Sequence, residues 1–141
     1  MTGGKFLIDV HILVNPETTV TEGHPIAETA RRDLIKAMPN IQDVLVQVDG
    51  EIDTNLENIY PLARQELIEI AHPIIAKLGN IKFEIRVHYL EEKNIVCVFL
   101  AIDLGQNMLN PHKLVSGLKS ELDSTPQIDR ARVFLDLNSG Y

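Results

Sequence analysis

The chain has 141 residues, of which 45% are hydrophobic and 23% charged, a composition typical of folded proteins with one ordinary core or two small ones. A formal net charge of −7 and a pI near 5.1 argue against a surface that binds nucleic-acid phosphates. The single cysteine, Cys97, excludes an internal disulfide framework and fits a reducing compartment, and no apolar run reaches the length of a membrane span.

Residues 6–14 predict a half-buried strand. Apolar side chains occupy every even position of this segment, whereas Asp9 and His11 fall on the opposite face together with Leu7 and Leu13. One face of the strand is therefore expected to pack against a core, and the other is expected to carry polar groups.

A helix and a second strand follow. Thr19 with Glu22 three residues later has the form of a capping box, and apolar residues then recur at helical spacing up to the Pro39-Asn40 stop, with Arg31 left to water. Alternating valines from Val44 predict a strand that ends near Gly50. The first fifty residues thus read as strand, helix, strand.

The remainder reads as a polar connector followed by helix, two strands, helix and strand. Pro61 and Pro73 each imply a break or kink in the first of these helices, and Asn110-Pro111 forms a credible start for the second helix. A tight polar turn at residues 91–93 predicts an antiparallel hairpin. The expected segments are a connector at 51–55, a helix at 54–78, strands at 81–90 and 94–104, a helix at 110–122 and a strand at 128–137.

The two halves of the chain show an internal repeat. The strand around His11 matches the pattern around Phe99, and a histidine follows thirteen residues later in each copy, because 24 − 11 = 13 and 112 − 99 = 13. We therefore predict an α+β protein with two related ferredoxin-like βαβ units in antiparallel or mixed sheets. The predicted division is residues 1–50, a connector at 51–55, and a second, degenerate unit at 56–138.

Five side chains of the first unit are candidates for chemistry. Asp9 and His11 share one face of the first strand, Gln47 and Asp49 share one face of the second, and His24 lies near the start of the helix. If these strands are close in one sheet, the groups converge at one end of the unit, and imidazole with carboxylate suits Zn²⁺. Spacing alone also allows ordinary surface histidines.

A resemblance to a known family favours the metal site. The runs KFLIDVHILV from Lys5, NPETTVTEGHPIA from Asn15 and MPNIQDVLVQVD from Met38 resemble the cytosolic C-terminal domain of the cation diffusion facilitator family, which exports Zn²⁺ and related metals. The resemblance covers roughly residues 4–50 and extends to the second unit only in outline. It implies a dimerising regulatory domain of a cation efflux transporter.

The resemblance implies that His11, His24 and Asp49 bind the metal, with Asp9 and Gln47 as weaker ligands. Gln47 stands where the family commonly has histidine, and an amide is a poorer zinc ligand than imidazole. A weak zinc site, or one that a second subunit completes, is therefore expected instead of a bridged pair of metals. The second unit retains only His112 and Asp136 of the pattern, because Phe99 and Phe134 replace the other two positions, and we interpret it as structural.

The resemblance also implies a helix and a strand before Phe6, which residues 1–4 are too few to supply. Two sources are open: a longer protein of which this chain is a fragment, or the long helix and hairpin of the second unit. As a fragment, the chain would be soluble by itself and would natively lie on the cytoplasmic side of the cell membrane, attached to the transmembrane domain of the same transporter.

We expect a homodimer that binds metal and is not an enzyme, since no catalytic triad, phosphate loop or paired-carboxylate cleft is present. No role is assigned to His72 or His88. Two alternatives remain open: a ferredoxin-like domain that senses a small organic molecule, and a purely structural dimerisation domain.

Overall fold

The computed structural model describes residues 5–51, 62–102 and 110–137, which form two compact units, 1–57 and 58–141. In chain order the elements are β1 (Phe6–Leu13), α1 (Val20–Ala37), β2 (Ile41–Asp49), α2 (Arg64–Ala76), β3 (Lys82–Leu90), β4 (Lys93–Ala101), α3 (Pro111–Asp123) and β5 (Arg130–Asp136). Both units alternate strands and helices as the α+β prediction requires, so the predicted fold class is confirmed.

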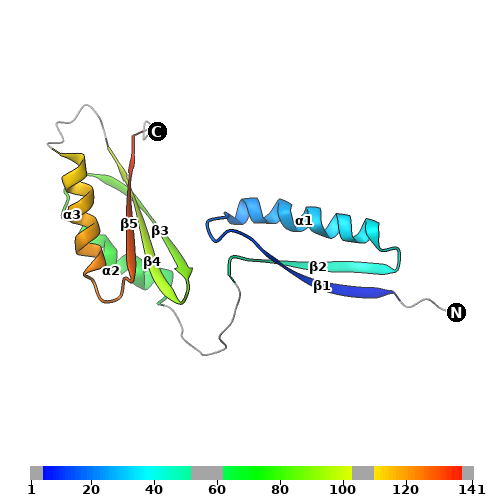
Figure 1. Ribbon diagram of the computed structural model, residues 1–141. Coiled ribbons are helices and arrows are strands. Elements are labelled where there is room, and N and C mark those ends of the chain that lie inside the picture. Colours follow the sequence, from blue (N-terminus) through cyan, green and yellow to red (C-terminus); the bar gives the residue numbers. More distant parts are fainter. Residues whose placement is uncertain (1–4, 52–61, 103–109, 138–141) are drawn as a thin grey trace. The chain divides into compact units, whose positions relative to one another are not determined.

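In the first unit, β1 and β2 pair in parallel and α1 covers one face of the pair (Figure 1). The even-numbered residues of β1 from Ile8 onward are half-buried on the helix side, and the odd-numbered ones are exposed, as their alternation predicts. Thr19 caps α1, since its Oγ1 accepts a hydrogen bond from the Glu22 N–H at 3.2 Å. Val44 is the one hydrophobic side chain of this unit that is fully buried among the described residues.

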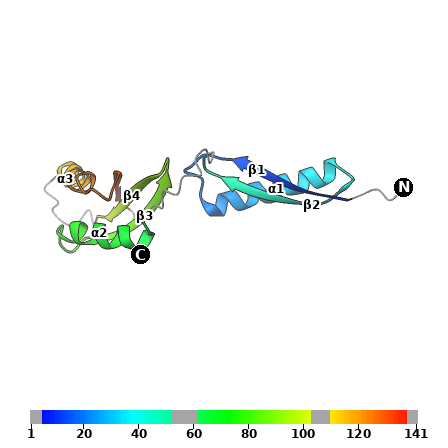
Figure 2. The same ribbon diagram turned by 90° about the horizontal axis from the view of Figure 1, so that it is seen from below.

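The second unit is a three-stranded sheet in the order β3-β4-β5, with β3 antiparallel and β5 parallel to the central strand. Helices α2 and α3 lie against the same face of that sheet (Figures 1 and 2). Its core consists of residues from both helices, the three strands and the loop before β5: Leu67, Ala71, Ile75, Ile85, Val96, Val98, Leu100, Leu118, Leu122, Ile128 and Ala131.

The hairpin of the second unit pairs with β5 and takes no part in the sheet of the first unit. The alternative in which this hairpin completes the first sheet is therefore wrong for the described residues. The reason is local, because a hairpin pairs at once with itself and α3 then returns the chain to lay β5 along the other edge of β4.

Helix α2 runs through Pro73 without ending there, so of the expected break or kink the break is excluded. A proline inside a helix costs one backbone hydrogen bond. Here Leu67, Ala71 and Ile75 are all buried on one stripe of the helix, and this packing offsets the loss. The expected break or kink at Pro61, residues 52–55 of the predicted 51–55 connector and the start of the predicted helix lie outside the described residues.

Helix α3 and the hairpin agree with their predictions. Asn110 caps α3 through its Oδ1, which accepts from the Lys113 N–H at 3.1 Å, and Pro111 occupies the first helical position. In the hairpin turn, Glu91 and Glu92 both adopt positive φ angles, 51° and 60°. Such angles are strained for residues with a Cβ, so this turn holds two side chains where glycine and asparagine are preferred.

Candidate metal centre

The candidate ligands of the first unit lie on the sheet face opposite α1. Parallel pairing sets His11 directly across from Gln47, Asp9 across from Leu45, and Leu13 across from Asp49. Because successive side chains alternate between the faces of a strand, Asp9, His11, Gln47 and Asp49 all project from the same face. The leucines around them are exposed as well, with Leu7 75% and Leu45 61% exposed.

His11 and Asp49 are brought into direct contact. The His11 Nδ1 atom lies 2.9 Å from the Asp49 Oδ2 atom, and the two side chains are 61% and 41% exposed. A carboxylate bound to Nδ1 fixes the orientation of an imidazole ring and raises its basicity, which makes Nε2 the nitrogen that a metal would take. Asp49 can therefore serve either as a ligand or as the group that orients the ligand His11.

His24 is the fifth residue of α1 and is exposed. Helix and strand approach closely at its neighbour: a Cβ on the buried Gly23 would lie 3.6 Å from the Val48 Cγ1 atom. The turn of α1 that carries His24 thus passes the end of β2 where Asp49 follows Val48. In the described residues, however, His24 does not complete a metal-binding group, because no three His, Cys, Asp or Glu side chains converge there.

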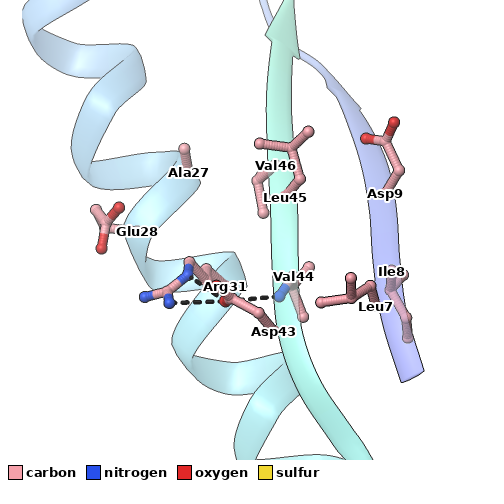
Figure 3. A pocket seen from close by; sticks show the side chains of 10 residues that line it. All are labelled: Leu7, Ile8, Asp9, Ala27, Glu28, Arg31, Asp43, Val44, Leu45 and Val46. Atoms are coloured by element: carbon pink, nitrogen blue, oxygen red, sulfur yellow. Dashed lines mark hydrogen bonds and ion pairs between the residues drawn. The ribbon is translucent and has the colours of Figure 1, made fainter. Parts of the chain in front are cut away.

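A shallow pocket in this unit lies away from the His11 and Asp49 pair. Its lining contains four charged residues, Asp9, Glu28, Arg31 and Asp43, together with apolar groups of β1, α1 and β2. Figure 3 shows Arg31 reaching from α1 to Asp43 on β2, where the Asp43 Oδ1 atom accepts from the Arg31 Nε and Nη2 atoms at 3.0 and 2.7 Å. Arg31, predicted to face water, is 41% exposed and in addition pairs with Asp43.

Asp43 also accepts a hydrogen bond from the backbone N–H of a buried residue. Its Oδ1 atom accepts from the Val44 N–H at 2.8 Å, in addition to the Arg31 guanidinium. The hydrogen bond from Arg31, with help from the Val44 N–H, holds the pKa of the Asp43 carboxyl below its ordinary value. Alternation on β2 gave no hint of this role, because what distinguishes Asp43 from other surface carboxylates is that it adjoins the buried Val44 and contacts Arg31 of α1.

The second unit places an aromatic pair where the first carries His11 and Gln47. Phe99 is paired with Phe134 in the β4–β5 register, and the two rings stack with centroids 4.9 Å apart. The Arg86 guanidinium lies 4.5 Å from the centre of the Phe99 ring. Neither phenylalanine can bind a metal. The second sheet therefore has two stacked rings at the positions where the first has the nitrogen and oxygen donors of His11 and Gln47.

The histidine and carboxylate of the second unit stay at the repeat positions. His112 is the second residue of α3, and Asp136 ends β5, as Asp49 ends β2. The backbones agree in detail, because the Val14 N–H donates to the Asp49 carbonyl and the Ile102 N–H donates to the Asp136 carbonyl. These positions therefore supply internal controls for the first unit.

The family model described as the cytoplasmic domain of cation efflux proteins matches residues 1–51. This match confirms the resemblance drawn from the first strand, helix and strand, and it lies within the first unit. A search of curated proteins and a search of solved structures gave no match. None of the helices in the described ranges is long and apolar enough to span a membrane.

Proposed function

We propose that the chain is a dimerising, metal-binding regulatory module of a divalent cation efflux transporter, with zinc as the metal it is best suited to bind. The proposal rests on one observation above all: the His11 Nδ1 to Asp49 Oδ2 contact of 2.9 Å, inside the segment that matches the cytoplasmic domain of cation efflux proteins. Imidazole supported by a carboxylate is a common arrangement at protein zinc sites.

One copy of the chain supplies too few strong ligands for a zinc ion, which usually takes four. His11 and Asp49 are together on the open face of the β1–β2 pair, whereas Gln47 is a weak donor and His24 stands apart from them. A second copy would complete the coordination sphere, and we accordingly assign the site to a homodimer interface with His24 and Asp9 as the additional ligands.

Electrostatics favours a cation at that interface. The open face of the first unit carries Asp9 and Asp49 but no lysine or arginine at the positions that project with them. Two such faces repel each other until a divalent cation offsets the carboxylate charges. Metal would therefore bind the associated state more tightly than the separate chains, and this differential affinity is what a regulatory ligand needs.

In the transporter, this equilibrium would report the cytosolic metal level to the transmembrane domain. Metal-driven association of two cytoplasmic domains would shift the population of the transmembrane arrangement to which they are attached. The second unit would support the arrangement without binding metal, because phenylalanines occupy two of its four ligand positions.

Isothermal titration of the purified chain with Zn²⁺ tests the site. The variants His11→Ala and Asp49→Asn should each lower the zinc affinity by about tenfold or more, as removal of a ligand or its orienting group does. The matched controls His112→Ala and Asp136→Asn alter the same repeat positions of the second unit and should leave the affinity unchanged. Light scattering with and without zinc follows the association state of each sample.

Equal binding by wild type and both first-unit variants would overturn the metal site. A dimer whose mass and melting temperature ignore zinc would favour the structural dimerisation domain. An organic adduct in native mass spectra, without a metal response, would favour the small-molecule sensor.

A further inference from the structure

The sheet of the second unit has one face that neither α2 nor α3 covers. Both helices lie against the same side of the sheet (Figures 1 and 2), and alternate residues of the strands project from the other side. We name this side the outer face. It consists of the even-numbered residues of β3 and β5 and the odd-numbered residues of β4, since the odd-numbered Ile85 and the even-numbered Val98 belong to the core on the helix side.

The outer face is basic although the chain is acidic. The chain has 13 lysines and arginines against 20 aspartates and glutamates. On the outer face of the described strands, alternation instead places five basic side chains against the two acidic ones of Glu84 and Asp136: Lys82, Arg86, Lys93, Arg130 and Arg132. Charges screen one another over about 8 Å at physiological ionic strength, so a local surplus of positive charge attracts anions even where the net charge is negative. The outer face therefore suits an anionic ligand.

Phe134 lies at the end of a row of stacked groups on this face. The Arg86 guanidinium lies 4.5 Å from the centre of the Phe99 ring, and the Phe99 and Phe134 rings stack with their centroids 4.9 Å apart. Arg86 comes from β3 and Phe134 from β5, on opposite sides of the central strand β4. Phe99 covers one side of the Phe134 ring, and 43% of Phe134 is nevertheless exposed. A planar ring can therefore extend the row on the side of Phe134 that faces away from Phe99.

Next to this row, arginines border an apolar strip of the central strand. Cys97 and Ile95 belong to the outer face, yet they are only 3% and 4% exposed. Arg86 and Arg132 lie directly across from Cys97 on the two neighbouring strands, and Arg130 lies across from Ile95. Long side chains of this kind lay their aliphatic stems on apolar surface and keep their charge in water. The strip is thus shielded by the stems and bordered by three guanidinium groups.

Arg86 is able to bind an anion in its observed position. Its Nε atom donates to the Glu84 Oε1 atom at 2.8 Å, which uses one of the five N–H groups of a guanidinium and leaves the Nη groups for a ligand. Arg86 and Arg132 belong to strands about 10 Å apart, two strand spacings. Guanidinium groups that approach from two sides can grip a phosphate between them, because their planar donor forks match its oxygens.

We propose that the outer face of the second unit binds a mononucleotide, whose planar ring stacks on Phe134 and whose phosphate accepts hydrogen bonds from Arg86 and Arg132. Phe134 and Arg132 are two residues apart on β5, roughly 7 Å along the strand, a separation that a ribose bridges. A long single-stranded nucleic acid fits less well, because a chain of net charge −7 repels a polyanion. The site goes beyond the proposed metal function, since it uses no metal and no residue of the first unit.

Isothermal titration of the whole chain with AMP tests the proposal. The titration is made in excess chelator, so that metal binding contributes nothing to the heat. Adenosine and inorganic phosphate serve as comparison probes, because each offers one half of the ligand. AMP should bind about tenfold more tightly than either, since it alone engages the ring of Phe134 and the arginines together.

Two variants separate the ring from the phosphate. Phe134→Leu should weaken AMP binding by about tenfold through the lost stacking, and Phe134→Trp should restore it. Arg86→Gln should weaken the binding of both AMP and phosphate by about tenfold. Lys113→Gln is the matched charge control, because it removes one positive charge from an exposed residue of α3, on the other side of the sheet, and should leave the AMP affinity unchanged.

Three results would overturn the proposal. The first is equal AMP affinity of wild type, Phe134→Leu and Arg86→Gln, or no binding of AMP to wild type. The second is phosphate binding as tight as that of AMP, which would reduce the face to a cluster of positive charge. The third is much tighter binding of a single-stranded oligoadenylate, which would assign the face to nucleic acid. The zinc titration depends on His11 and Asp49, so its outcome is independent of all three.

Discussion

Eleven buried side chains form the core of the second unit, whereas in the described part of the first unit only the hydrophobic side chain of Val44 is buried. Both units contain the same strand-helix-strand arrangement, but the second adds α2 and β3, which cover a further part of the sheet and the second edge of its central strand. The unit with the larger buried core has Phe99 and Phe134 at two of the candidate ligand positions, where the unit with the sparse core has His11 and Gln47. A buried core and a set of candidate donor groups are thus divided between two copies of one architecture.

The largest difference should appear when equivalent leucines are truncated. Leu122 and Leu34 each follow the repeat histidine by ten residues, yet Leu122 is fully buried and Leu34 only partly. Leu122→Ala should cost about 2–5 kcal/mol of unfolding free energy through the cavity it leaves. Leu34→Ala should cost about 1 kcal/mol, because less of its surface leaves water on folding.

Hydrogen exchange measured for each unit, combined with urea denaturation, separates the two leucine effects. Similar losses of stability for both variants would mean that the first unit is as well packed in solution as the second, and the contrast drawn from burial would then fail.

Introducing a histidine at Gln47 should increase the difference in zinc binding between the two units. Gln47→His places an imidazole directly across from His11 and should raise the zinc affinity by about tenfold or more, since histidine is a far better zinc ligand than an amide. Phe134→His makes the same change at the equivalent position of the second unit and should leave zinc binding as in wild type. Calorimetric titration of both variants provides the measurement, and a gain in the second unit alone would reverse the assignment.

The hairpin turn offers a smaller, purely conformational change in the second unit. Replacing Glu91 and Glu92 by Asn and Gly should stabilise this unit by about 1 kcal/mol, because these residues accept positive φ angles with less strain. The change is read from the urea midpoint at constant m-value. An unchanged or lower midpoint would show that the glutamates make contacts that outweigh the strain.

The smallest expected effect is that of acid on the unfolding free energy of the first unit, through Asp43. Its pKa is lowered from the ordinary 3.8 by the hydrogen bond from Arg31, so the folded chain binds this proton less readily than the unfolded chain. The resulting stability is present above the unfolded-state pKa and is lost as pH falls below 3.8 through the folded pKa. Asp43→Asn should therefore flatten the fall of unfolding free energy in this acid range, and an unaltered pH profile would exclude the ion pair as its source.

Asp123 provides the corresponding test in the second unit. Burial raises the pKa of its carboxyl. Hydrogen bonds from Lys119 and from the Ala131 N–H together lower this pKa by more than burial raises it, so the net change is downward. Its stabilising contribution has the same sign and the same acid range as that of Asp43, so Asp123→Asn should flatten the pH profile of the second unit. The comparison uses the unit-resolved hydrogen exchange described for the leucines.

The fold was predictable to a large extent because its signals are local. Alternation in β1 and β2, the Thr19 and Asn110 caps and the hairpin turn each depend on a few adjacent residues, and each agrees with the structure. Whether the expected helix breaks at Pro73 was not predictable, because the burial of Leu67, Ala71 and Ile75 depends on partners distant in the sequence. Tertiary packing decided between a broken helix and a continuous one.

The candidate site was predictable in part. Strand alternation places His11 and Asp49 on one face, and parallel pairing at the observed register brings them within hydrogen-bonding distance. The placement of His24 depends on the rotation of α1 over the strands, which helical periodicity does not determine. The Arg31 and Asp43 pair was missed for a similar reason, since charged residues on a helix and on a strand edge give no sequence signal of their contact.

The carboxylates that cap Val44 and Ala131 have a further consequence for assembly. Asp43 occupies the Val44 N–H on the outer side of β2, and Asp123 occupies the Ala131 N–H on the outer side of β5, so an added strand would first have to displace an acid from each of these edges. Each acid therefore obstructs the addition of a strand at one edge of its own sheet, which limits edge-to-edge aggregation there.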